Sequence, residues 1–320
     1  MHRGLVGDRG LVGTDYLAKA KLRQEYEAEI APRTEAALRR ILRQVSFEPG
    51  QPRRVLDLGA GTGAAGRAVR AHFAADVELL AVDKTAGPGI VVADVLHGAR
   101  PTGVSGRFDL IVAAHLLNEL DQHLDLDGKA RLVAGWCSNL LEPNGMCIVI
   151  EPALRETSRT LLGVRDRLLG KGLCVAAPCF FRGACPALQR ERDWCHDSAE
   201  VLVAGRSRVD FSYLVLLRSA LGEVDPRRYR VVSDPIKDKG RLRLFVCGVT
   251  GRHQLTRLDR DRQSGNQALD EARRGEVLMV SRAVLGDDGL RIVADSAVGI
   301  EAAPATCRPR SRPDTSLARG

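Results

Sequence analysis

The chain has 320 residues, of which 44% are hydrophobic and 28% are charged; this is the composition of a folded globular protein and excludes a disordered one. A formal net charge of +8 and a pI near 9.3 indicate an acidic partner, with nucleic acid as the first choice. No apolar run reaches the roughly 18 residues of a membrane span, so we expect no membrane partner, and the first 15 residues lack the apolar core of a secretory signal.

The first 50 residues are predicted to be helical. Apolar side chains recur at helical spacing from 15 to 46, and Pro32 stands where a first helical turn tolerates proline. The sequence EPGQP at 48–52 then breaks the pattern. We expect an N-terminal helical segment over residues 1–50.

Residues 51–150 alternate short apolar runs with helical stretches. The runs lie at 55–58, 79–82, 90–92, 110–113 and 147–150, and helices are predicted at 64–73, 115–120 and 128–141. Strands that are apolar on both faces and joined by helices are typical of a doubly wound, mostly parallel α/β sheet of the Rossmann-like type. A further helix is predicted at 155–169.

The second half of the chain begins with a predicted cysteine-rich insertion at 172–200. The sequence FSYLVLLR at 211–218 has the composition of a strand, and 229–249 is predicted to form an antiparallel hairpin that closes the sheet. These elements give one domain over 51–249. We expect a small β-rich appendage at 250–300 and a disordered, basic tail at 301–320.

Positive charge is concentrated between residues 201 and 260, where 13 Lys and Arg residues accompany 6 Asp and Glu residues. Arginine suits bidentate phosphate contacts, so this stretch is predicted to face RNA. The alternative is a solvated surface in an arginine-rich proteome.

The segment VLDLGAGTGAAG at 55–66 has the pattern of a strand, a glycine turn and a helix start. Gly61, Gly63 and Gly66 fit G-x-G-x-x-G, which dinucleotide-binding folds share. Asp57 and Gly59 extend it to D-x-G-x-G-x-G, the usual first motif of class I methyltransferases. We therefore predict S-adenosyl-L-methionine (SAM) as the ligand, with a nicotinamide cofactor or an empty site as alternatives.

The predicted SAM-binding residues are Asp57, Gly59, Gly61, Gly63, Asp83, Asp94, Ala114 and His115. Asp83 ends the second predicted strand, where a carboxylate can hold a ribose diol, and Asp94 ends the third, near the expected adenine. Each has a structural alternative: a cap on local amides for Asp57, a helix N-cap for Asp83, a turn for Asp94 and a structural imidazole for His115.

No catalytic residue can be assigned from the sequence. The chain lacks the N/D-P-P-Y/F/W motif with which many base-amine methyltransferases hold an exocyclic nitrogen, and EPAL at 151–154 follows the fifth predicted strand instead. Methyl transfer depends mainly on alignment, because the sulfonium of SAM is already activated.

Four of the eight cysteines fall between residues 174 and 195. Cys179, Cys185 and Cys195 share one irregular loop, and reduced thiols in such a cluster indicate a metal or simply buried thiols. From spacing alone the fourth ligand could be Cys174, His196 or a distant residue. The pattern is not the paired C-x-x-C of zinc ribbons.

The chain resembles the methyltransferase-like proteins of the mitochondrial ribosomal small subunit and their bacterial relatives. The resemblance rests on CVAAPCFFRGACPAL and DWCH in the cysteine stretch, on FSYLVLLR and LFVCG, and on VLDLGAGTGAAG and IVAAHLLNEL, and it covers roughly residues 15–295. It implies a SAM-type fold that acts on small-subunit ribosomal RNA or assembles around it.

The resemblance also implies a [4Fe–4S] cluster held by Cys179, Cys185, Cys195 and Cys247, with zinc as the alternative, since spacing cannot separate the two. Cys174 then becomes a non-ligand. The sequence departs from the family around CFFRGAC, where relatives often have Pro-His, and at Asp197, where an aromatic residue is usual.

The expected function is that of a SAM-dependent methyltransferase-like protein for small-subunit ribosomal RNA or the assembling small subunit. The alternatives are a non-catalytic assembly factor that binds SAM and an iron–sulfur cluster, and, less favoured, a small-molecule methyltransferase. We expect a cytoplasmic protein of bacterial type, or else one of the mitochondrial matrix, and a monomer when free.

Overall fold

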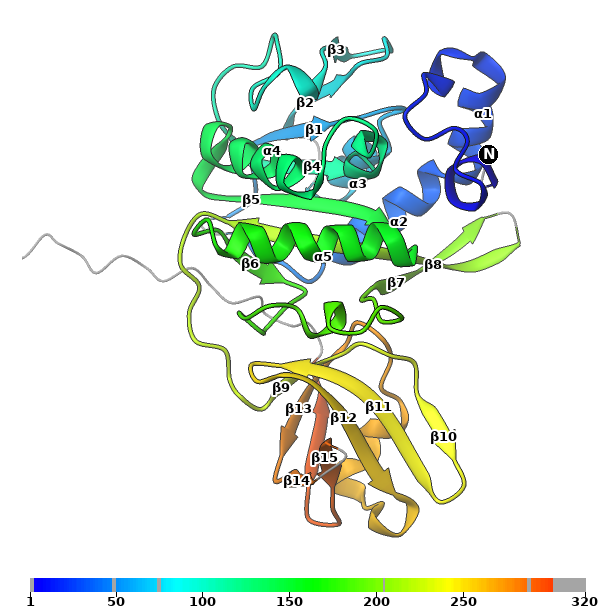
Figure 1. The fold of residues 1–320 in the computed structure, drawn as a ribbon, viewed down its shortest axis with the longest axis vertical. Helices are drawn as coiled ribbons and strands as arrows, with labels where there is room; N and C mark the ends of the chain where they lie inside the picture. Colours follow the sequence, from blue (N-terminus) through cyan, green and yellow to red (C-terminus); the bar gives the residue numbers. More distant parts are fainter. Residues whose placement is uncertain (1–2, 48–49, 74–75, 204, 287–288, 302–320) are drawn as a thin grey trace, which may run out of the picture.

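The computed structural model describes residues 3–47, 50–73, 76–203, 205–286 and 289–301, and these form two β-sheets with helices around the first (Figure 1). Residues 302–320 of the expected tail lie outside the described residues. Among the helices described, none has the length and apolar character that crossing a membrane requires.

The first sheet is built from the N-terminal two thirds of the chain. Its strands are β1 (Arg54–Leu58), β2 (Glu78–Asp83), β3 (Ile90–Val92), β4 (Phe108–Ala114), β5 (Leu141–Pro152), β6 (Cys174–Ala177), β7 (Asp197–Val203) and β8 (Arg206–Leu217). The order is β3-β2-β1-β4-β5-β8-β6, with β7 paired to β8. The first five strands are parallel, and β8 runs antiparallel to β5 and β6. This confirms the predicted class I methyltransferase fold.

Helices cover both faces of this sheet (Figure 1). They are α1 (Ala20–Glu29), α2 (Ala31–Leu42), α3 (Ala64–Phe73), α4 (Leu126–Asn139) and α5 (Arg155–Leu169), with shorter turns at Arg3–Gly7, Tyr16–Ala18, Val95–His97, Leu117–Leu120 and Pro186–Leu188. Alternate residues of β1 enter opposite cores: Leu56 packs with Trp136 on the α4 side, and Val55 packs with Leu38 on the α2 side. Burial on both faces explains the uninterrupted apolar runs of the strands.

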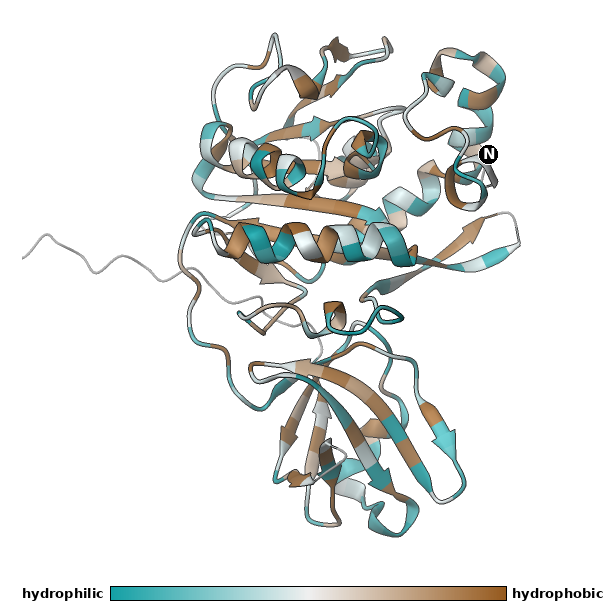
Figure 2. Ribbon diagram, in the orientation of Figure 1, coloured by the Kyte–Doolittle hydropathy of each residue, from teal (hydrophilic) through white to brown (hydrophobic). Residues whose placement is uncertain are grey.

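The second sheet belongs to the C-terminal third. Its strands are β9 (Arg228–Val231), β10 (Ile236–Asp238), β11 (Arg241–Gly248), β12 (Gly251–Leu258), β13 (Val277–Ser281), β14 (Val284–Gly286), β15 (Gly289–Ile292) and β16 (Ala297–Ile300), with short helical turns at Asp259–Asp261 and Ser264–Asp270. It encloses a core of its own, to which Leu244, Leu255 and Ile292 contribute. Figure 2 shows both apolar (brown) and polar (teal) stretches along β11 and β12.

The prediction that 229–249 closes the first sheet is wrong. β9 and β11 pair with each other in the second sheet, where β13 and β12 are their outer neighbours. The buried side chains of Val231, Leu244 and Val246 fill the second core, whereas β8 supplies the antiparallel strand of the first sheet. The expected boundary at 249 therefore separates two paired strands, and Cys247 lies in the second sheet.

Candidate active site and cysteine cluster

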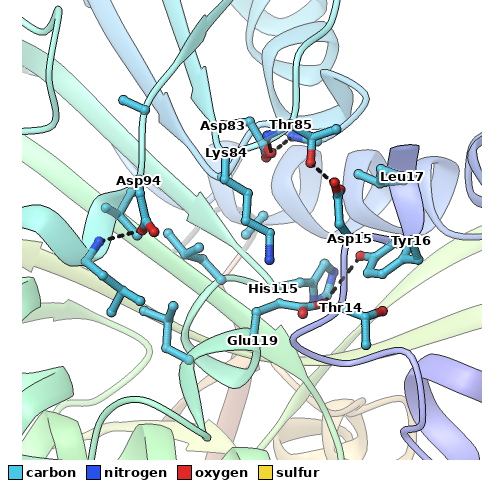
Figure 3. A pocket seen from close by; sticks show the side chains of 18 of the residues that line it. Thr14, Asp15, Tyr16, Leu17, Asp83, Lys84, Thr85, Asp94, His115 and Glu119 are labelled. Carbon is cyan, nitrogen blue, oxygen red and sulfur yellow. Dashed lines mark hydrogen bonds between the residues drawn. The ribbon is translucent and has the colours of Figure 1, made fainter. Parts of the chain in front are cut away.

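A cavity of about 130 Å³ opens at the carboxyl ends of β1, β2 and β4 (Figure 3). The strand order reverses between β1 and β4, and ligands of open α/β sheets bind at such a switch point. Six of the eight predicted SAM-binding residues line the cavity: Gly59, Gly61, Asp83, Asp94, Ala114 and His115. Asp57 and Gly63 are not among its lining residues.

The glycine loop follows β1 and forms one wall of this cavity. Gly59, Gly61 and Gly63 have φ values of +70°, +56° and +81°, a left-handed region that L side chains rarely adopt. A Cβ at Gly59 would also lie 2.9 Å from Leu116 Cδ1. The loop therefore needs glycine for its backbone conformation and, at Gly59, for its close approach to Leu116, which follows β4.

Asp57 lies beneath the glycine loop and not on the cavity surface. Its buried Oδ2 accepts a hydrogen bond from the Gly66 amide at 3.1 Å, which joins β1 to the first turn of α3. Burial raises the pKa of Asp57 to about 7, against the lowering effect of the Gly66 amide. This geometry agrees with the structural alternative, a cap on local amides.

Asp83 ends β2 and holds two backbone amides. Its Oδ2 accepts from Gly61 at 2.8 Å, and its Oδ1 accepts from Thr85 at 2.8 Å. Asp83 thus fixes the glycine loop against the end of β2, and each oxygen keeps a further lone pair that can face the cavity. It caps a loop and not a helix, which differs from its predicted structural alternative.

Asp94 and His115 occupy two other walls. Asp94 caps the short turn Val95–His97 through a 2.8 Å bond from the Leu96 amide to Oδ1. His115 follows β4 with φ of +59°, and its Nδ1 is buried without a partner among the described residues. Burial lowers the pKa of His115 to about 4, so the ring is neutral at pH 7 and can still hydrogen-bond to a ligand.

The N-terminal segment closes the cavity from outside, which sequence reasoning did not anticipate. Asp15 accepts a 2.8 Å hydrogen bond from the Thr85 hydroxyl, and the Tyr16 hydroxyl donates to Glu119 at 3.4 Å. Figure 3 shows Lys84 extending from the end of β2 toward His115 and Glu119. The sequence predicts a helix at Asp15 and Tyr16. For Lys84, the only signal in the sequence is its position next to Asp83.

A second cavity of about 230 Å³ adjoins the first. Both cavities are lined by Tyr16, Tyr26, His115 and Glu119, so these side chains form the boundary between the two. Residues 152–154, from the EPAL sequence at the end of β5, line the second cavity as well. Its position beside the predicted donor site makes it the candidate acceptor site.

The cysteine loop, residues 178–196, lies between the two sheets (Figure 1). Arg165 of α5 donates to the Gly183 carbonyl at 2.6 Å, and Arg159 donates to the Asp193 carbonyl at 2.7 Å. From the second sheet, Arg252 of β12 forms a 2.9 Å ion pair with Asp193. Guanidinium groups from both domains thus hold an irregular segment whose carbonyls no strand pairs.

The fold brings together the four predicted ligand cysteines. Burial, followed by the charges of neighbouring cysteines, raises the pKa of Cys185 to about 12 and that of Cys195 to about 11. The pKa of Cys247 is raised by burial and then by Cys179, Cys195 and Cys185. Cys174 instead packs, partly buried, against the α2-side core of the first sheet, as a small hydrophobic residue does.

The cysteine cluster has the positive charge that a tetrathiolate metal site needs, but not the preformed arrangement of ligands. Arg165 lies close enough to lower the pKa of Cys185 and Cys247, and Arg230 and Arg252 lower that of Cys195, so positive charge is available to offset thiolates. Within the described residues, however, no group of three or more His, Cys, Asp or Glu side chains is arranged to hold a metal ion. The donor types fit a metal or a cluster, but the side chains are not preformed around one ion.

The family model described as "Mitochondrial small ribosomal subunit Rsm22" matches residues 21–277. A search of curated proteins gives no match. Among solved structures, the plantazolicin methyltransferase BpumL in complex with SAH has a TM-score of 0.39 and 10% identity, over 65% of this chain and 94% of that one.

Two further methyltransferase structures show comparable similarity. The magnesium protoporphyrin IX methyltransferase ChlM from Synechocystis PCC 6803, with bound SAM, has a TM-score of 0.34 and 12% identity over 68% of this chain and 94% of its own. TrmN from Thermus thermophilus has a TM-score of 0.33 and 18% identity over 59% and 52%. Similarity at this level does not carry the substrates of those proteins over to this chain.

Proposed function

The chain belongs to the family of the mitochondrial small ribosomal subunit protein Rsm22, and from this premise we propose that it is a SAM-dependent methyltransferase acting on the RNA of the small ribosomal subunit. The observation that carries the proposal is the pair of adjoining cavities. Tyr16, Tyr26, His115 and Glu119 line both, so a donor in the first and an acceptor in the second would meet at these side chains.

The donor cavity fits SAM through this chain's own groups. Gly59 and Gly61 place the backbone of the glycine loop at the cavity wall, Asp83 and Asp94 supply carboxylates at the ends of neighbouring strands, and His115 has a buried Nδ1 without a partner among the described residues. When bound, SAM supplies a sulfonium whose C–S bond breaks as an acceptor lone pair takes the methyl group, leaving a thioether and releasing one acceptor proton.

Glu119 is placed to receive that proton. Among the described residues it is the carboxyl that lines both cavities, and burial raises its pKa, which makes it a stronger base than an exposed carboxylate. The remaining contribution is alignment: holding donor and acceptor in line can supply about 7–11 kcal/mol of the barrier.

The test incubates the protein with methyl-labelled SAM and either naked small-subunit RNA or immature small subunits. Label in the RNA, lost in Glu119→Gln while SAM binding persists, supports the enzyme. Tight binding of both partners without label supports the second candidate, a non-catalytic assembly factor. That candidate is favoured by the cysteine loop, which joins the two domains away from both cavities and serves no step of the transfer.

We propose that Cys179, Cys185, Cys195 and Cys247 bind a [4Fe–4S] cluster that joins the cysteine loop to β11, with zinc as the alternative. Support comes from the shared electrostatic environment of the four thiols and the guanidinium groups around them. Because metal would displace thiol protons that burial holds, binding should weaken as pH falls.

Cys247→Ser tests this metal proposal, with Cys174→Ser as the matched control. Anaerobically purified protein should contain equal iron and sulfide and absorb in the visible range. Cys247→Ser should lose most of this iron, and Cys174→Ser should keep it. Colourless protein with stoichiometric zinc would replace the cluster by zinc, and equal iron in both variants would exclude Cys247 as a ligand.

The family description names the mitochondrial ribosome, which fits the expected location in the mitochondrial matrix. The cytoplasm of a bacterium, the first expectation, offers the same class of partner in its own small subunit. We propose a monomer in the free state.

A further inference from the structure

A third cavity, of about 630 Å³, extends the row formed by the donor and acceptor cavities. It lies between α2, the β7–β8 hairpin and the β9–β10 and β12–β13 connections of the second domain. Arg208 of β8 lines both this cavity and the acceptor cavity. The three cavities are therefore linked through shared side chains, from the donor site to the space between the domains.

The third cavity is strongly basic. Its lining contains six arginines and three carboxylates: Arg39, Arg40, Arg43, Arg208, Arg273 and Arg274, against Glu200, Asp234 and Glu276. Arg208 and Arg274 share Asp234. Across the described part of the chain, no carboxylate forms an ion pair with the side chains of Arg40, Arg43 or Arg273.

The basic stretch at 201–260 is more neutral in the structure than its sequence predicts. Arg230 pairs with Asp197, Arg252 with Asp193 and Arg257 with Asp270. Much of its charge is thus neutralised within the protein. Positive charge without an ion pair among the described residues lies instead at the C-terminal end of α2, on Arg40 and on the C-cap residue Arg43, which the charge count did not single out.

The acceptor cavity has a basic pair of its own. Arg33 of α2 is buried, and its Nε has no hydrogen-bond partner among the described residues. Burial lowers the pKa of Arg33, and the nearby charge of Arg206 lowers it further, while Glu29 opposes both. A buried guanidinium whose Nε lacks a partner is stabilised by an anion in the cavity that it lines.

We propose that the acceptor cavity receives one unpaired RNA base, and that the flanking backbone lies on an arginine track formed by Arg33, Arg40, Arg43 and Arg273. The proposal rests on the proposed function and specifies its substrate as single-stranded. A cavity of 230 Å³ bounded by Tyr16 and Tyr26 suits a single flat ring, whereas a paired base could not leave its helix without being flipped out.

The first test measures phosphate contacts. Arg40→Gln/Arg43→Gln is compared with Arg70→Gln/Arg131→Gln, which removes the same charge from exposed positions of α3 and α4. With a fluorescent 12-nucleotide single-stranded RNA, Arg40→Gln/Arg43→Gln should bind at least tenfold more weakly. The slope of the logarithm of the binding constant against the logarithm of the salt concentration should become shallower by about 1.4. The control should change less than twofold. Equal losses of RNA affinity in both double variants would contradict RNA binding by the arginine track. Tighter binding of the same sequence as a duplex would contradict a single-stranded substrate.

The second test follows the base. A 2-aminopurine in the RNA should change fluorescence on entering the acceptor cavity, and Ala153→Phe, which fills that cavity, should abolish the change while Ala153→Ser keeps it. Bound SAM is measured in each variant as the control for folding. RNA binding that depends on Arg40 and Arg43, together with base entry but no transfer of the methyl label from SAM to RNA, would support the arginine track and contradict the proposed catalysis. An unchanged signal in Ala153→Phe would overturn base entry.

Discussion

Two buried carboxyls show how single residues in this fold are matched to their surroundings. The carboxyl of Asp57 lies beneath the glycine loop and accepts a hydrogen bond from the Gly66 amide. The carboxyl of Glu151 lies beside the turn after β4, where its Oε1 accepts a hydrogen bond from the Leu117 amide at 2.9 Å. Burial raises the pKa of Glu151 to about 8 and that of Asp57 to about 7. Both carboxyls therefore retain protons in the folded protein at pH values where exposed carboxyls are ionised.

Glu151 predicts a specific pH dependence of stability. The folded pKa lies above the unfolded value of 4.5, so the folded state binds the extra proton between about pH 4.5 and 8, and the free energy of unfolding falls as pH rises through that window. The expected slope from this group is roughly 1.4 kcal/mol per pH unit between pH 5.5 and 7. Glu151→Gln should remove it in urea unfolding, whereas Glu223→Gln, at an exposed carboxylate, should leave it. An unchanged slope in Glu151→Gln contradicts the assignment.

Gly59 tests the close approach at the donor site. Gly59→Ala imposes a left-handed alanine, at a cost of about 1–2 kcal/mol, and places Cβ 2.9 Å from Leu116. We expect SAM affinity in equilibrium dialysis to fall at least tenfold. Gly50→Ala is the matched control, since Gly50 has φ of +87° but no atom near its missing Cβ. Equal SAM affinity in both variants would show that the glycine loop does not form the donor site.

At the scale of elements, local periodicity predicted α3 and α5 at the bounds they have, and it placed the first five strands correctly. It could not determine which sheet a strand joins. β11 alternates buried residues with more exposed ones, as a strand of either sheet could, and only long-range packing decides between two cores. The predicted helix at 115–120 is a single 3-10 turn, Leu117–Leu120.

In the candidate site, too, the residues in local motifs were predictable from the sequence and the long-range contacts were not. The glycine loop and the strand-end carboxylates follow local motifs, so Gly59, Gly61, Asp83 and Asp94 could be found from sequence. Tyr16 and Glu119 could not, because they meet across 103 residues and the segment IVAAHLLNEL, which contains Glu119, gives no sign of that contact.

The N-terminal cover of the donor cavity yields an element-scale prediction. Arg9 connects this segment to Asp121 at 2.8 Å and to Glu156 at 3.3 Å. Arg9→Ala should loosen the cover and increase the dissociation rate of SAM by up to about fivefold, as expected for a partly exposed ion pair. Stopped-flow displacement measures this rate. A rate unchanged from the parent protein would mean that the cover does not limit release.

At the scale of the whole molecule, the two domains share a buried polar contact. Arg230 of β9 donates to Asp197 at 2.6 Å, to the Tyr213 hydroxyl at 2.8 Å and to Gln44 at 3.0 Å. The contact joins the second sheet to β7, β8 and the segment after α2. It thereby fixes the space between the domains in which the third cavity lies.

Removing one partner of this contact should be costly. Arg230→Ala leaves Asp197 buried and unpaired, and we expect a loss of about 3–5 kcal/mol in the free energy of unfolding. The double variant Arg230→Met/Asp197→Asn should recover part of that loss, because it buries no charge. Urea unfolding of both variants measures the difference. A loss below about 1 kcal/mol in Arg230→Ala would show that the pair does not hold the domains together.

We propose that the two adjoining cavities form one methyl-transfer site. Its most direct test is a single turnover with protein in excess over labelled SAM and small-subunit RNA, following S-adenosylhomocysteine and methylated RNA together. We expect the two products to appear in equal amounts in the parent protein, and neither to appear in Glu119→Gln, which still binds SAM. Recovery of unreacted SAM with RNA fully bound to the parent protein would contradict the account.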